Sequence, residues 1–132
     1  MLFGCKGSLG VSEIVEPKNH DQFNSRLHDI WALKSIDEKV IGSEQSNAYL
    51  EFNLTTEKVY GNTGCNSISG NLTIHSDTLI LSNLAVTEML CFNFQNEQEY
   101  ISLIQLPMVY RIEELELVLK STRATLIFRK VD

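Results

Sequence analysis

The sequence predicts an α+β fold in which an antiparallel β-barrel, or a strongly curved sheet, carries a single helix near residues 96–106. Three features of the 132 residues predict it. Short segments of alternating apolar and polar residues recur at close intervals, as is typical of antiparallel strands. Only the stretch near residues 96–106 shows the helical spacing of apolar residues. Three glycines between residues 61 and 70 mark a tight corner between two strands.

The first strands are expected before that corner. Trp31, Leu33 and Ser35 share one strand face, and the large ring of Trp31 is expected in the core. Residues 50–54 alternate between apolar and polar side chains, which predicts a half-buried strand. Residues 55–58 are expected to turn the chain into the next strand.

The corner, residues 59–70, is the stretch around which the rest of the chain is organised. Its glycines are Gly61, Gly64 and Gly70, with Cys65 and Asn66 at the centre. Glycine is needed where the backbone turns with positive φ or where another backbone approaches closely. A phosphate-binding loop is the alternative, but no Gly-Lys-Ser/Thr follows and no helical pattern begins here. The pattern therefore favours a structural corner that holds a cysteine in place.

Further strands follow the corner. Residues 68–74 alternate, and Gly70 inside this strand indicates a bulge or a tight bend. Residues 75–77 are expected to turn, residues 79–81 to form another strand, and residues 84–89 to continue in extended form.

Helical spacing then replaces the alternation. Asn96 is expected to cap a helix that runs to Leu106, and Pro107 ends it. The apolar stripe of this helix consists of Tyr100, Leu103 and Ile104.

The chain is expected to close with strands. Residues 109–112 form one of them, and Leu115, Leu117 and Leu119 alternate with other side chains in the next. That strand and residues 124–128 form a hairpin through residues 120–123.

Composition excludes several classes of partner. The net charge of −6 argues against nucleic-acid binding and against attraction to anionic lipid. No apolar run approaches the roughly 20 residues needed to cross a bilayer. The length and an apolar share of 43% are typical of one globular domain.

Two motifs resemble those of the META domain family, whose bacterial members include the HslJ heat-shock lipoproteins. One is similar to the family signature G-x-x-G-C-N-x-x-x-G and the other to its T-x-M-x-C element. The motif residues are Gly61, Gly64, Cys65, Asn66, Gly70, Thr87, Met89 and Cys91. The likeness runs from Trp31 to Phe128, and Leu72 stands where many members carry an aromatic residue.

The resemblance implies a cracked β-barrel that the helix interrupts, as in the pilot lipoproteins of type III secretion. It also implies that Cys65 and Cys91 form a disulfide, because the family places the two motifs together. A pair of buried free thiols is the alternative.

The third cysteine suggests a lipid anchor. Leu2-Phe3-Gly4-Cys5 resembles the end of a bacterial lipobox, so Cys5 is a candidate for lipidation. The basic region and long apolar core of a signal peptide are missing, and a stray thiol is the other interpretation. Residues 1–19 are expected to be a lipobox remnant and flexible tether, and residues 20–132 the domain.

No catalytic or metal constellation emerges from the spacing. A Cys-His nucleophile would need Cys65 or Cys91 to be reduced and to lie near His75. Two His-Asp pairs, at 20–21 and 28–29, match no common zinc spacing. We therefore expect no cofactor, no metal and no enzymatic activity.

The expected function is that of a non-catalytic lipoprotein domain of the bacterial cell envelope, anchored by lipid in the outer membrane. It is expected to bind an envelope protein or an apolar ligand in a stress or secretion setting. An uncharacterised thiol-dependent enzyme is the alternative, and free, titratable thiols would favour it.

The helix is expected to replace part of the barrel wall, and the seam between helix and strands, here called the helix seam, is the candidate place for an apolar ligand cleft. Tyr100 and Leu103 on the helix and Tyr110 just after it are the candidates for lining it. A filled interior is favoured over an open cleft, because small barrels usually pack their cores solid.

Overall fold

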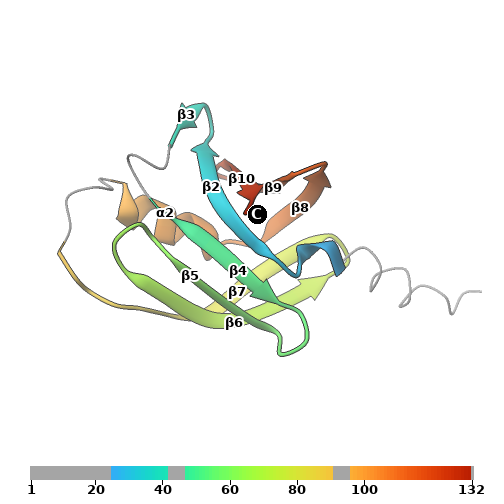
Figure 1. The fold of residues 1–132 in the computed structure, drawn as a ribbon, viewed down its shortest axis with the longest axis horizontal. Helices are drawn as coiled ribbons and strands as arrows, with labels where there is room; N and C mark the ends of the chain where they lie inside the picture. The colour runs from blue at the N-terminus through green and yellow to red at the C-terminus, as the bar shows by residue number, and fades with distance from the viewer. Residues whose placement is uncertain (1–24, 42–46, 91–95, 132) are drawn as a thin grey trace, which may run out of the picture.

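The computed structural model describes residues 25–41, 47–90 and 96–131 (Figure 1). A 3₁₀ turn, η2 (Ser25–Leu27), leads into the sheet, and the only helix of the described residues is α2 (Glu97–Ile104). The strands are β2 (Ile30–Ile36), β3 (Lys39–Val40), β4 (Tyr49–Asn53), β5 (Lys58–Asn62), β6 (Ser67–His75), β7 (Thr78–Val86), β8 (Met108–Glu113), β9 (Glu116–Lys120) and β10 (Thr125–Lys130).

The strands form one antiparallel sheet that closes into a ring. Its order is β10-β9-β8-β7-β6-β5-β4-β2-β3, and β10 also pairs with β2. Figure 1 shows β2 (blue) beside β10 (red), although nearly the whole domain separates them in sequence. The expected α+β fold, with a strongly curved antiparallel sheet and one helix, is confirmed.

Hydrogen bonds at one end of the β2–β10 contact reinforce the closure. The N–H of Asp37 donates to the carbonyl of Thr125 at 2.7 Å. In return, the N–H of Thr125 donates to Asp37 Oδ1 at 2.9 Å. The φ angle of Asp37 is +54°, so the residue that follows β2 takes a left-handed turn conformation.

The ring is weakest between β7 and β8. These strands share two residue pairs, Thr78–Val109 and Leu79–Met108, at the beginning of each strand. In sequence, α2 lies between them, and it contributes Tyr100, Leu103 and Ile104 to the core. The two strands of the ring that share the fewest residue pairs are thus the ones that α2 separates in sequence.

Two details of the expected elements were wrong. Asn96 lies at the N-cap position of α2, but its side chain makes no capping hydrogen bond. Leu115 does not continue the buried face of Leu117 and Leu119 and is 53% exposed. The reason is that Glu114 takes a φ of +57°, which places Leu115 in the β8–β9 turn.

The hydrophobic core is built from side chains of the strands, of η2 and of α2. Trp31, Phe52 and Phe128 are among its largest fully buried side chains. Trp31 Nε1 donates to the carbonyl of Leu27 at 3.2 Å, so the indole N–H is satisfied and η2 is held against the ring.

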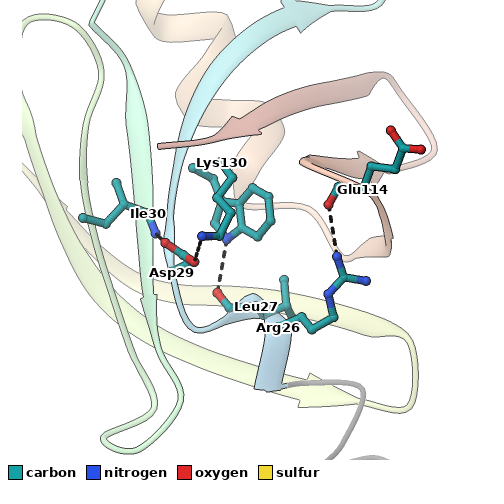
Figure 2. A network of polar contacts seen from close by, with 7 residues as sticks. Arg26, Leu27, Asp29, Ile30, Glu114 and Lys130 are labelled. Atoms are coloured by element: carbon teal, nitrogen blue, oxygen red, sulfur yellow. Dashed lines mark hydrogen bonds and ion pairs between the residues drawn. The ribbon is translucent and has the colours of Figure 1, made fainter. Parts of the chain in front are cut away.

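Polar contacts surround that junction (Figure 2). Arg26 Nη2 donates to the carbonyl of Glu114 at 3.0 Å, and Lys130 Nζ lies 3.1 Å from Asp29 Oδ2. The described chain is thus attached at its beginning to both the β8–β9 turn and the end of β10.

Candidate functional site

The glycine corner connects β5 to β6, and two of its glycines are required by close backbone approaches. A Cβ at Gly61 would lie 2.3 Å from the carbonyl oxygen of Tyr49 on β4. A Cβ at Gly70 would lie 2.8 Å from the carbonyl oxygen of Ser82, where the β6–β7 register shifts. Gly64 has a φ of +101°, in the region that favours glycine. The bulge or bend expected at Gly70 is therefore present.

Asn66 lies at the centre of a polar cluster and is itself 3% exposed, whereas Met89 in the same cluster is 62% exposed. Its Oδ1 accepts hydrogen bonds from the N–H of Met89 at 2.6 Å and from Thr87 Oγ1 at 2.8 Å. Its Nδ2 donates to Glu97 Oε2 at 2.7 Å and to the carbonyl of Met89 at 3.2 Å. One side chain thus joins the corner, the segment after β7 and the first turn of α2.

Thr63 completes the cluster from inside the corner. It is fully buried, and its Oγ1 accepts from the N–H of Asn66 at 2.8 Å and of Cys65 at 3.2 Å. The same hydroxyl donates to Glu97 Oε2. The carboxylate of Glu97 therefore receives two hydrogen bonds from the corner.

Thr87 ties the second motif to the first. Its Oγ1 accepts from the N–H of Ser67 at 3.0 Å in addition to its bond with Asn66. Its N–H donates to the carbonyl of Ser67 at 3.1 Å. We call Thr63, Asn66, Thr87, Met89 and Glu97 the motif cluster.

Cys65 borders the motif cluster. Its Sγ lies 3.5 Å from the carbonyl oxygen of Met89 and 3.4 Å from Asn66 Nδ2. Cys91, two residues after Met89, lies outside the described residues, as does Cys5. The disulfide and the lipidation therefore stay predictions.

The residues expected to line a cleft lie in or against the core. Tyr100 is 0% exposed and Leu103 is 2% exposed, while Tyr110 is half-buried. Burial raises the pKa of Tyr100 far above its ordinary value, because the phenolate would be removed from water. Burial, followed by the negative charge of Asp77, also raises the pKa of Tyr110. A cleft at these positions would require core side chains to move.

Of the two His-Asp pairs, the structure describes His28 and Asp29, and each of them accepts a hydrogen bond from a backbone N–H. His28 Nδ1 accepts from the N–H of Leu54 at 3.0 Å, and Asp29 Oδ1 accepts from the N–H of Ile30 at 2.8 Å. Within residues 25–41, 47–90 and 96–131, no group of three or more His, Cys, Asp or Glu side chains is placed to hold a metal ion. No helix in those ranges is long and apolar enough to span a bilayer.

Two members of the motif cluster, Thr63 and Glu97, were not predicted from the sequence as site residues. Thr63 was visible only as a turn residue, and Glu97 only as an acid near the beginning of a helix. Their contact joins positions 34 residues apart, and no local pattern predicts such a pairing.

The chain is similar to one known protein family. A family model described as the META domain matches residues 25–132. No match was found among curated proteins.

Two solved structures share the fold. One is the NMR structure of a protein from Burkholderia xenovorans, with a TM-score of 0.68 and 20% identity, covering 83% of this chain and 87% of that one. The other is also an NMR structure, with a TM-score of 0.65 and 23% identity, covering 79% of this chain and 90% of that one.

Proposed function

Because the chain belongs to the META domain family, we propose that it is a non-catalytic, lipid-anchored domain of the bacterial cell envelope. In this proposal the domain binds an envelope protein or an apolar ligand in a stress or secretion setting. Lipid attached to Cys5 holds it at the outer membrane.

The observation that carries the non-catalytic part is how the motif cluster uses its polar atoms. The side-chain oxygen of Asn66 accepts hydrogen bonds from Thr87 and Met89, and its side-chain nitrogen donates one to Glu97. A group that acts on a substrate needs a lone pair or proton directed at that substrate. The polar atoms of this cluster are directed at one another, which supports a role in holding the fold.

A disulfide between Cys65 and Cys91 belongs to the same proposal. Cys65 lies beside Met89, which brings the corner next to the segment that leads to Cys91. The bridge is expected to stabilise the fold by roughly 3–4 kcal/mol on the chain-entropy account.

Thiol analysis separates this proposal from a thiol-dependent enzyme. Natively purified, oxidised protein is alkylated under denaturing conditions without reductant and then analysed by mass spectrometry. We expect neither Cys65 nor Cys91 to be alkylated. Alkylation at both positions would reject the disulfide and favour the enzyme.

The lipid anchor is tested with the intact precursor in fractionated bacterial cells. We expect the parent in the membrane fraction and Cys5→Ser in the soluble fraction, because several acyl chains at about 0.8 kcal/mol per buried CH₂ supply the membrane affinity. A Cys5→Ser form that remains in the membrane as fully as the parent contradicts the anchor. A pull-down from intact envelopes, with the lipidated form as bait, tests for a protein partner.

The apolar ligand at the helix seam has its own test. A fluorescent fatty acid is titrated into the parent and into Leu103→Trp. Saturable binding that Leu103→Trp weakens supports a cleft at Tyr100, Leu103 and Tyr110. An absence of binding at tens of micromolar leaves these three as ordinary core residues.

A further inference from the structure

A pocket of about 750 Å³ lies where η2, the β4–β5 turn and β6 meet. Its lining consists of Ser25, His28, Leu54, Thr55, Glu57, Leu72, Thr73 and Ile74. The volume falls in the range of pockets that hold small molecules. None of the residues assigned to the motif cluster or to the helix seam belongs to it.

The apolar part of the pocket is continuous with the protein core. Leu72 is buried, and Leu54 and Ile74 are partly buried side chains packed against the core cluster. All three are aliphatic, so this surface suits a flexible alkyl chain rather than a ring that would stack on an aromatic side chain.

Among the described residues that line the pocket, the polar part carries one formal charge, which is negative. Glu57, Thr55 and Thr73 are exposed at the rim, and none of the described lining residues is a lysine or an arginine. His28 Nδ1 accepts the N–H of Leu54, so the neutral imidazole carries its proton on Nε2. A carboxylate or phosphate ligand would therefore meet the negative charge of Glu57, with no lysine or arginine among the described lining residues to compensate for the repulsion.

We propose that this pocket binds a short alkyl chain that ends in a primary amine. The chain covers Leu54, Leu72 and Ile74, and the ammonium group lies beside the carboxylate of Glu57. This inference rests on the proposed role as a binding domain, but it concerns a site separate from the helix seam and independent of the lipid anchor. The amine belongs either to a free alkylamine or to a lysine side chain of a partner.

The test uses the full chain and three probes of equal length, namely hexylamine, hexanol and hexanoate. The methyl NMR signals of Leu54, Leu72 and Ile74 report binding. We expect saturable shifts, with hexylamine about fivefold tighter than hexanol, the size of a partly screened interaction with one exposed charge. Hexanoate should bind most weakly.

Glu57→Gln should remove the preference for hexylamine over hexanol while leaving hexanol binding unchanged. Glu114→Gln is the matched control, because Glu114 is also an exposed glutamate with positive φ in a hairpin turn. It changes the net charge equally and should preserve the preference. Thr73→Trp, a change at the exposed rim, should block all three probes without touching the core.

The proposal is overturned if hexanoate binds as tightly as hexylamine, if Glu57→Gln keeps the preference, or if the methyl groups of Leu54, Leu72 and Ile74 show no saturable shift. Hexylamine is also compared with Nα-acetyl-lysine methylamide, in which the side-chain amine is free. Tighter binding of the lysine derivative assigns the amine to a partner protein, and tighter binding of hexylamine assigns it to a small molecule. Neither the thiol analysis nor the membrane fractionation depends on these results, so the two proposals can fail separately.

Discussion

A single asparagine side chain, that of Asn66, connects three segments that are distant in sequence. Removing it leaves the N–H of Met89, the hydroxyl of Thr87 and the carboxylate of Glu97 without their partner at this position. Each of these partly buried hydrogen bonds contributes about 0.5–1.5 kcal/mol to stability. We expect Asn66→Ala to lower the free energy of unfolding by about 3 kcal/mol, measured by urea unfolding followed through Trp31 fluorescence.

Asn71→Ala is the control for that measurement. Asn71 Oδ1 accepts from Lys58 Nζ at 2.9 Å in an exposed contact, so its loss should cost less than about 1 kcal/mol. If Asn66→Ala is no more destabilising than Asn71→Ala, the motif cluster does not stabilise the fold as described.

At Gly61 the constraint is steric. An added Cβ would lie 2.3 Å from the carbonyl oxygen of Tyr49, and because this atom belongs to the backbone, no side-chain rotation relieves the clash. We expect Gly61→Ala to destabilise the protein by about 2 kcal/mol, the range for a forced backbone shift. Ser69→Ala, at an exposed position on the neighbouring strand, should change stability by less than about 0.5 kcal/mol. Equal melting temperatures for the two variants would show that β4 and β5 separate at no cost.

Among the elements, α2 is distinguished by its buried tyrosine. The folded state holds Tyr100 protonated because its pKa is raised, whereas the unfolded chain loses that proton above pH 10. The unfolded state therefore binds fewer protons at high pH, and the free energy of unfolding falls as pH rises through 10. We expect Tyr100→Phe to reduce that fall between pH 9 and 11 by about 1 kcal/mol.

Urea unfolding at several pH values measures this effect as a slope, which is independent of any stability difference at neutral pH. Tyr60→Phe, at a tyrosine that is 43% exposed, should keep the slope of the parent. A slope that Tyr100→Phe leaves unchanged would mean that Tyr100 reaches water in the folded protein.

For the whole molecule, closure of the ring depends on contacts between β2 and β10. Asp37 contributes both a left-handed backbone conformation and an acceptor for the N–H of Thr125. Asp37→Asn keeps both features and should leave stability within about 0.5 kcal/mol of the parent, since asparagine tolerates positive φ. Asp37→Ala loses both and should cost about 2 kcal/mol.

The comparison of these two variants by thermal and urea unfolding isolates the closing contact. Asp37→Gly should lie between them, because glycine accepts the φ angle but has no side-chain oxygen. Equal stability of the alanine and asparagine variants would remove Asp37 from the account of ring closure.

The sequence determined several of the buried strand faces, although not the position of Leu115, which lies in a turn. Successive side chains of a strand point to opposite faces, whichever strand it pairs with. The buried faces of β4 and β6 were therefore predicted from a few residues each. The helix was readable from the spacing of Tyr100, Leu103 and Ile104. Glycine marks a backbone constraint at its own position, and for that reason Gly61 and Gly70 also stood out.

The tertiary structure decided which edges pair and which distant polar groups meet. Alternation reports the buried face of a strand but not its neighbour, so the β2–β10 closure had no local signal. The contact between Thr63 and Glu97, and the pocket lined by His28 and Glu57, each bring together residues that are distant in sequence. Such contacts follow from burial accumulated over the whole domain, which no short window of the sequence contains.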